Sequence, residues 1–392
     1  MRHSLSSKFQ GTLLGSALGN FIGIQYQNQL LGIVAETVDL QPILKLTKHQ
    51  HLPLTGVNSI PKSSNGKLQT GKNSSECGRL AVACAQSLIR CGDLDLKDWG
   101  DTWEAFAKSE FYDSSNTEGK SLLHPCEAAV AALPTAMFFH ENKAKLREKL
   151  MLATDVWQNQ SASECQTGVL AVGYAIARSL KEKLDPATAI PETITYLVTD
   201  NALTQLLSQV QILLEQGADL ERATTHLCKS AIALQERPDE SQKKSQTNSI
   251  VKPENFIPMA IAFYCFLSTP EDLRLSVFRA ARCGIAAPLT CSLTGALSGA
   301  YNGAAAIPVE WRSRHSAAVA SRSAAEGREP SVWLTGNDAK IKQLANNLFA
   351  IWTGVYSPDS EPEPPVMPPV VAAPYVIRVA KKRSNPRETQ SY

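Results

Sequence analysis

Two short segments hold residue types that could carry nucleophilic or acid–base chemistry. Glu76 and Cys77 are adjacent, and His124-Pro125-Cys126-Glu127 brings an imidazole, a thiol and a carboxyl group together. A cysteine nucleophile needs a base, usually histidine, to take its proton. A site formed by Cys126, His124 and Glu127 is therefore conceivable, although sequence neighbours seldom face each other in a useful way. Glu76 and Cys77 are weak catalytic candidates. The alternative interpretation makes Glu76 an acid in the first turn of a helix, where the helix dipole favours a negative charge.

The nine cysteines favour buried thiols over a disulfide framework or a metal site. Their number is odd and none forms a C-x-x-C pair. Cys77, Cys84 and Cys91 recur every seven residues, which places them along one stripe of a helix. Thiols without disulfide spacing are typical of a reducing compartment, so we predict a cytoplasmic protein. His49 and His51 fall in a polar loop, where we expect solvated side chains, and we predict no metal site.

Composition excludes several classes of function. The chain has 392 residues, 43% of them apolar, and a formal net charge of +2. This balance gives no electrostatic reason to expect nucleic acid or an anionic membrane as a partner. There is no run of about 18 apolar residues that would span a bilayer, and the polar start, residues 1–10, does not resemble a secretory signal. We therefore expect a soluble globular domain.

The spacing of apolar residues predicts an all-α bundle. Val/Ile-rich alternation is scarce, whereas apolar residues at three- and four-residue spacing recur along most of the chain. Thr269 and Pro270 read as an N-cap and a first helical residue, with acids in the first turn. The predicted helices cover residues 9–22, 76–91, 126–140, 164–182, 202–215, 221–236, 256–268, 271–283, 290–303 and 339–354.

Composition also divides the chain. Residues 47–75, 236–255 and 312–336 are polar and read as long loops. From Ser357 onward prolines crowd together, followed by a basic end from Arg378 to Arg387. We interpret residues 1–356 as one helical domain and residues 357–392 as a disordered Pro-rich and basic tail.

Four segments carry a resemblance to a known family. The first holds Gly11, Gly15, Gly19 and Gly23, one slowly winding stripe that allows a close helix contact. The others, in chain order, are Ala81-Val82-Ala83-Cys84-Ala85-Gln86-Ser87-Leu88, Ala132-Leu133-Pro134, and Gly295-Ala296-Leu297-Ser298-Gly299-Ala300-Tyr301-Asn302-Gly303. Their order and spacing resemble the ADP-ribosylglycohydrolase family. The resemblance implies an orthogonal helical bundle and, for typical members, a magnesium-dependent hydrolase.

The residues that would hold the family's metals are mostly replaced. Aligned on the matching segments, the family's cleft positions fall on Asn20, Ser75, Glu76, Cys77, Cys126, Glu127, Ala286 and Pro288. A pair of hard divalent cations needs several carboxylate oxygens, and cysteine is a poor magnesium ligand. The family's arginine position near Cys126 falls on Ala131 and is lost as well. We therefore expect no metal and no cofactor.

These observations predict a pseudoenzyme: a catalytically degenerate family member that binds a small molecule or a protein and acts in regulation. One alternative is a hydrolase of ADP-ribosyl or related glycosidic bonds that works without the usual metals. Another is a scaffold that recruits a partner through its C-terminal tail, with the bundle as a platform.

Overall fold

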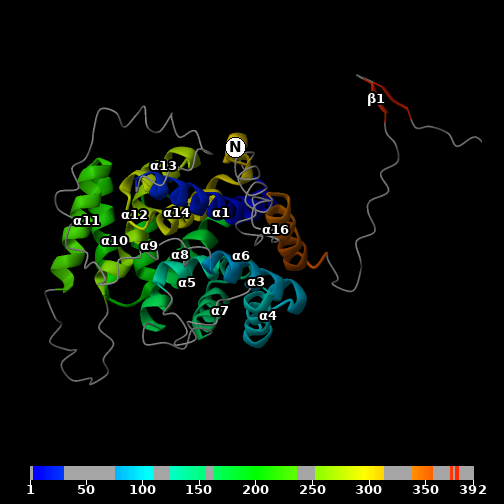
Figure 1. Cartoon of the computed structure of the whole chain (residues 1–392), viewed down its shortest axis with the longest axis horizontal. Coiled ribbons are helices and arrows are strands. Elements are labelled where there is room, and N and C mark those ends of the chain that lie inside the picture. The colour runs from blue at the N-terminus through cyan, green and yellow to red at the C-terminus, as the bar shows by residue number, and fades with distance from the viewer. Residues whose placement is uncertain are drawn as a thin grey trace, which may run out of the picture.

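The structure is a computed structural model that describes residues 3–30, 76–109, 124–155, 162–235, 252–312, 338–355, 371–373 and 376–378. Most of these residues are helical (Figure 1), so the all-α prediction is confirmed. Ser75, His49 and His51 lie outside the described residues. So do the greater part of the three predicted loops and most of the C-terminal tail.

Two glycine-rich helices form the centre of the bundle: α1 (Leu5–Leu30) and α14 (Ala287–Asn302). A Cβ placed on Gly15 would lie 2.3 Å from the carbonyl oxygen of Gly295, and one on Gly295 would lie 2.0 Å from that of Gly15. Such distances are far below van der Waals contact, so only glycine permits this approach of two backbones. The close helix contact predicted from the glycine stripe is confirmed.

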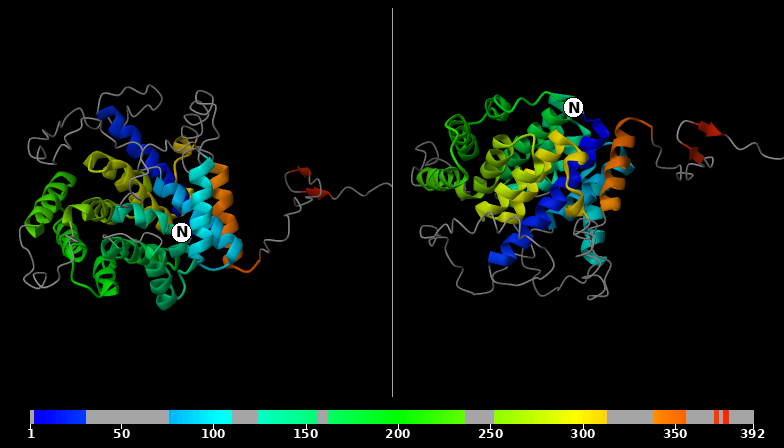
Figure 2. Two further views of the ribbon diagram at one scale, coloured as in Figure 1. Left: turned by 60° about the horizontal axis from the view of Figure 1, so that its bottom comes forward. Right: turned by 90° about the horizontal axis from the view of Figure 1, so that it is seen from above.

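The remaining helices surround this pair in two groups. Figure 2 shows α3 and α16 side by side, which agrees with their contacts, and α16 also packs against α1. The group on that side comprises α3 (Glu76–Cys91), α4 (Leu96–Ser109), α5 (Pro125–Ala131), α6 (Leu133–Phe138), α7 (Lys143–Asp155), α8 (Ala162–Leu180) and α16 (Asp338–Trp352). The second group comprises α9 (Ala189–Leu197), α10 (Ala202–Glu215), α11 (Leu220–Gln235), η4 (Pro253–Phe256), α12 (Ile257–Ser268), α13 (Leu273–Cys283) and η5 (Ala304–Ala306).

Some boundaries differ from the predicted ones. The segment predicted as one helix over 126–140 is two, α5 and α6, because Pro134 has no N–H to continue the backbone ladder. The predicted N-cap Thr269 is wrong for α13: Thr269 ends α12, and the Asp272 side chain caps α13 by accepting from the Leu275 amide. Asp272 can do so because its backbone is extended, as a capping residue requires.

Residues 371–373 and 376–378 pair as a short antiparallel hairpin, β1 (Val371–Ala373) with β2 (Val376–Arg378). The sequence pattern did not predict these strands. No described helix is long and apolar enough to cross a bilayer.

Candidate ligand cleft

The turn before α14, residues 284–289, has no acidic residue, whereas the resemblance implies an acidic turn at this place. Gly284 and Ala286 both adopt left-handed backbone conformations, with φ of 70° and 40°. Pro288 lies in the first turn of α14 and has no N–H, while the amides of Leu289 and Thr290 both bond to the carbonyl of Ala286. This helix start therefore presents fewer free donors than helix N-termini usually do.

Asn20 of α1 faces this turn. Its side chain is fully buried, and Nδ2 donates a hydrogen bond of 3.4 Å to the carbonyl oxygen of Pro288. Gly23, one turn further along α1, brings its backbone so close to α14 that a Cβ there would lie 2.3 Å from the oxygen of Ala287. Asn20 thus lies against the turn that contains positions 286 and 288. The contact is a hydrogen bond from an amide to a carbonyl oxygen, where the resemblance would place carboxylates around a metal ion.

The starts of α3, α5 and α8 lie close to one another. Cys77, Cys126 and Cys165 stand near the first residues of the three helices and are all buried. Burial raises the pKa of the Cys126 thiol well above its usual value, and the neighbouring Glu127, Cys165 and Cys77 raise it further. The structure therefore brings Cys77 and Cys126 together, and it adds Cys165. No sequence pattern marked Cys165, apart from its place after an acid in the first turn of a helix.

Glu76 begins α3, but its side chain is not among the parts that the structure describes. Glu76 and Ser75 accordingly stay predictions as cleft residues.

His124 and Glu127 form a cap at the start of α5. His124 Nδ1 accepts a hydrogen bond from the amide of Cys126 at 3.2 Å, and Glu127 Oε2 accepts one from the amide of His124 at 3.0 Å. The Cys126 thiol donates instead to the carbonyl of Asn255, 3.8 Å away. The idea that His124, Cys126 and Glu127 form a nucleophile–base group is therefore wrong in this arrangement, because the imidazole nitrogen that would take the thiol proton is engaged by the backbone.

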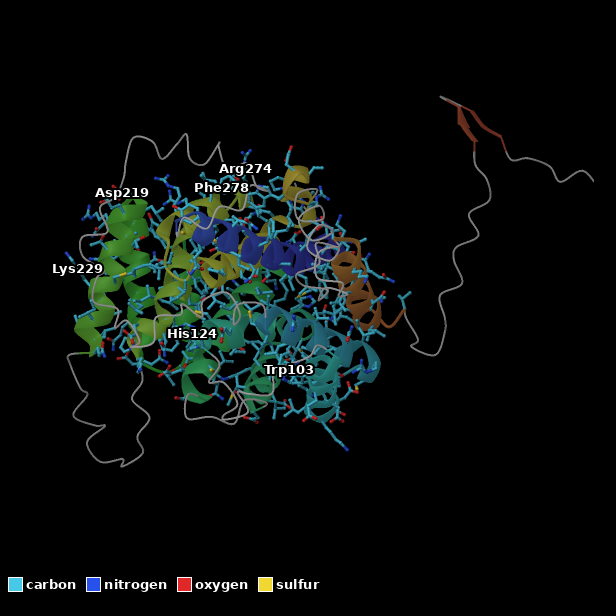
Figure 3. The ribbon with its side chains drawn as sticks, viewed as in Figure 1. Trp103, His124, Asp219, Lys229, Arg274 and Phe278 are labelled. Atoms are coloured by element: carbon cyan, nitrogen blue, oxygen red, sulfur yellow. The ribbon has the colours of Figure 1, made fainter. Side chains whose placement is uncertain are left out.

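Burial also fixes the charge of His124, lowering its pKa to about 4. The ring is neutral at neutral pH, and because Nδ1 accepts, Nε2 carries the proton. Figure 3 places His124 on the lower side of the bundle, well away from Arg274 and Phe278 of α13.

Glu164, in the first turn of α8, is a buried acid that sequence reasoning missed. One carboxylate oxygen accepts from the backbone amide of Lys252 and the other from Nδ2 of Asn255, both at 3.1 Å. Both oxygens are thus used to hold η4 against α8. Lys252 follows Glu164 by 88 positions in the chain and Asn255 follows it by 91, so no local sequence pattern could indicate these contacts.

The described residues do not fit a pair of magnesium ions. Such ions need several carboxylate oxygens around a shared space. Positions 20, 286 and 288 instead offer an amide that donates, a methyl group and a proline ring. Among the described residues no group of three or more His, Cys, Asp and Glu side chains could hold a metal.

Two surface depressions lie elsewhere. One of about 370 Å³ follows the first turns of α11, where Figure 3 labels Asp219 and Lys229, and one of about 250 Å³ lies between α9 and α10. Neither is lined by a cleft residue predicted from the sequence.

Comparison with known proteins agrees with the fold. A solved chain described as an ADP-ribosylglycohydrolase-related protein complex has the same fold: TM-score 0.50 at 14% identity, covering 89% of this chain and 99% of that one. No curated protein sequence matches. The family model for ADP-ribosylglycohydrolase matches residues 1–354, nearly all of the helical bundle. The protein thus belongs to the ADP-ribosylglycohydrolase family.

Proposed function

We propose that this protein is a catalytically degenerate ADP-ribosylglycohydrolase that binds a ligand without hydrolysing it. The observation that carries the proposal is the hydrogen bond from Asn20 to the carbonyl of Pro288. It joins two positions that hold metal-binding acids in typical members, and neither side of it is a carboxylate.

The chemistry of these positions supports a cleft that is stable without an ion. Clustered carboxylates repel one another until a cation relieves the repulsion. An asparagine, an alanine and a proline need no such relief, and α1 and α14 pack backbone to backbone at this place. The family's usual means of activating water is accordingly missing from the described residues.

The ligand class that fits best is small and either neutral or anionic. Three helices, α3, α5 and α8, begin close to one another, and helix N-termini favour partial or full negative charge. We propose that such a ligand lies over the turn 284–289, where Ala286 is exposed to solvent.

A regulatory role in a reducing, cytoplasmic compartment forms part of the proposal. All nine cysteines are free thiols, which agrees with such a compartment. The two alternatives, a metal-independent hydrolase and a scaffold that acts through its tail, each predict a different outcome in the experiment below.

The test is a thermal-shift and turnover screen against ADP-ribose, ADP-ribosylated protein and related glycosides, with magnesium and with a chelator. We expect a shift in Tm that is the same under both conditions, and no release of ADP-ribose. Release with magnesium would overturn the proposal, and release that resists the chelator would favour the metal-independent hydrolase. Absence of any shift, together with binding of a partner by the isolated tail, would favour the scaffold.

A pair of variants locates the ligand. Ala286→Trp places a bulky side chain on an exposed residue at the turn and should abolish the ligand-induced shift. Val355→Trp changes a residue that is 83% exposed after the last helix of the bundle and should preserve the shift. Equal shifts in both variants would exclude the turn as the binding place.

A further inference from the structure

Helix α13 presents both cationic and apolar side chains to solvent. One side of this helix packs on the core, and its buried residues are Leu273, Ser276, Val277, Ala280 and Ala281. The three- and four-residue spacing of an α-helix puts Arg274, Leu275, Phe278 and Arg282 together on the other side. Leu275 is 44% exposed and Phe278 is half-buried, whereas the outer side of a surface helix normally carries polar residues. We call these four residues the α13 face.

Two aromatic rings and a guanidinium group meet on the α13 face. The guanidinium carbon of Arg274 lies 5.4 Å from the centroid of the Phe278 ring. The centroids of the Phe278 and Trp311 rings are 5.2 Å apart, with 53° between the ring planes. Figure 3 labels Arg274 and Phe278 next to each other at the upper edge of the bundle. The apolar part of the α13 face thus continues onto Trp311, which comes from the segment after α14.

The two arginines of the α13 face are placed to bind an anion. Among the residues that the structure describes, neither Arg274 nor Arg282 forms an ion pair. Arg274 lies over a ring with the flat side of its guanidinium group, so the N–H groups along the edge can still reach a carboxylate and bind it with two parallel hydrogen bonds. Arg279 differs, because it donates to the Tyr264 hydroxyl at 2.9 Å and is therefore not part of the α13 face.

The residue types on the α13 face are those of protein–protein contacts. Arg, Trp and Phe are enriched at the centres of such interfaces, where truncation of a side chain costs the most affinity. A single exposed apolar residue needs no explanation. Here, however, Leu275 shares a helix side with Phe278, and Val309, two residues before Trp311, is 63% exposed. This surface therefore fits a partner that supplies both apolar side chains and carboxylates.

We propose that the α13 face and Trp311 bind an acidic peptide segment of a partner protein. An apolar side chain of that segment packs against Leu275 and Phe278, and acidic side chains beside it bind Arg274 and Arg282. The proposal does not depend on the ligand cleft, because Arg274 lies about three turns of helix before the turn 284–289.

Charge and symmetry favour a peptide over two other occupants. Glu271 and Asp272 directly precede α13 and Glu310 directly precedes Trp311, so acids stand next to this surface in the chain. A short peptide can place its few acids on the two arginines, whereas a nucleic acid brings a charged phosphate at every nucleotide. A second copy of this chain would bring arginine against arginine, because a two-fold interface joins identical surfaces.

The first experiment selects sequences from a random peptide library on phage, with the full-length protein as the target. We expect enriched sequences in which Asp or Glu flanks an apolar residue. No enrichment, or enrichment of sequences without acids, would overturn the proposal. Sequences that match residues 357–365 of this chain, which hold Asp359, Glu361 and Glu363, would make the chain itself the occupant and would also overturn it.

The second experiment measures the Kd of the most enriched peptide by fluorescence polarisation. Arg274→Gln should raise the Kd at least about tenfold because it removes the charged hydrogen bonds, and Arg274→Lys should restore only part of the affinity because an ammonium group cannot form two parallel bonds. Leu275→Ser should raise the Kd at least about threefold. Arg222→Gln and Ile232→Ser change exposed residues of α11 and are the matched controls that should leave the Kd unchanged. Wild-type affinity in both Arg274→Gln and Leu275→Ser would place the peptide elsewhere and contradict the proposal.

Further measurements on the wild-type protein decide between the occupants. The same peptide with Asn and Gln in place of its acids should bind at least about tenfold more weakly. Single-stranded oligothymidylate of equal formal charge should also bind more weakly than the acidic peptide. Tighter binding of the oligonucleotide, removed by Arg274→Gln, would assign the face to nucleic acid and overturn the proposal. Sedimentation at several protein concentrations tests for a second copy, and a dimer that Leu275→Ser dissociates would overturn the proposal in the same way.

Discussion

The amide nitrogen of Asn20 donates across the contact between α1 and α14 to the carbonyl oxygen of Pro288, 3.4 Å away. This bond joins residues 268 positions apart at the place where the resemblance puts two acids. A carboxylate at position 20 could only accept, and it would face a carbonyl oxygen that also only accepts. The local structure is therefore adapted to an amide.

Asn20→Asp should lower the free energy of unfolding by about 2–4 kcal/mol at neutral pH, because it removes a donor and buries a charge. Burial raises the pKa of such an acid above its unfolded value, so the loss should shrink as pH falls and the group becomes neutral. Urea unfolding at two pH values measures both effects. The control is Asn201→Asp, at the N-cap of α10, where a carboxylate can still accept from the Thr204 amide and little change is expected. Equal losses in both variants would refute the role given to Asn20.

Introducing an aspartate at position 286 or at position 288 should affect the free energy of unfolding differently. Ala286 is exposed, left-handed and directly before the helix, so Ala286→Asp should be neutral or stabilise by up to about 1 kcal/mol. Pro288 is buried, and Pro288→Asp should destabilise by about 1–3 kcal/mol without metal. Urea unfolding with and without magnesium tests this. A double variant that magnesium stabilises and that hydrolyses ADP-ribosylated protein would contradict the prediction.

The local sequence pattern correctly predicted helices that have a clear capping residue and a regular apolar stripe. Helix α10 has the predicted bounds because Asn201 and Thr204 form a capping box next to a regular apolar stripe. Helices α4, α7 and α9 were not predicted. In α7 only Leu146, Leu150, Ala153 and Thr154 are buried, which leaves a polar sequence with a weak stripe.

The cleft could be predicted only in part for a similar reason. The motif spacing marked Asn20, Cys77, Cys126 and the α14 turn as candidate cleft positions, because each sits at a fixed place in a recognisable helix. The contacts of Glu164 with residues 252 and 255 depend on how the chain packs in three dimensions. The spacing of residues along the sequence does not predict such packing.

The glycine contact between α1 and α14 should tolerate no side chain. Gly15→Ala would place a Cβ 2.3 Å from the Gly295 oxygen, and we expect a loss of at least about 3 kcal/mol or failure to fold. Gly100→Ala in α4 is the matched control: no atom lies within 4 Å of its added Cβ, so it should stabilise by about 0.5–1 kcal/mol. Thermal unfolding of the two variants compares them directly. A folded Gly15→Ala protein of wild-type stability would disprove the contact.

The end of the folded domain should lie just after α16. Phe349 and Trp352 of this helix pack on Phe9 with ring centroids 5.4 and 6.1 Å away, and Ile341 and Leu348 are fully buried. A chain ending at Tyr356 should keep its cooperative unfolding and its Tm within about 2 °C, because the family match ends at residue 354. A chain ending at Gly336 should lose several kcal/mol of stability. Calorimetry of the two truncations separates them, and a shorter chain as stable as the longer one would contradict the assigned boundary.

His124 should make the protein less stable as the solution becomes acidic. Its pKa is about 4 in the folded protein because the ring is buried, against an ordinary value of 6.5. Above pH 6.5 both states are neutral at this residue, so nothing changes. Between pH 6.5 and about 4 the unfolded chain takes up a proton that the folded one refuses, so the free energy of unfolding falls as pH falls. The loss amounts to at most about 3 kcal/mol and is complete just below the folded pKa.

His124→Asn isolates this contribution, because asparagine keeps an oxygen that can accept from the Cys126 amide but does not titrate. We expect the variant to lose less stability than the wild type between neutral pH and about pH 4.5, as measured by urea unfolding. The buried His140, whose pKa burial also lowers, and the carboxylates titrate in both proteins, so the difference between the two slopes belongs to position 124. His226→Asn, at an exposed site on α11, is the matched control for replacing a histidine by asparagine. Identical slopes for wild type and His124→Asn would show that the ring takes up its proton in the folded protein as readily as in the unfolded chain.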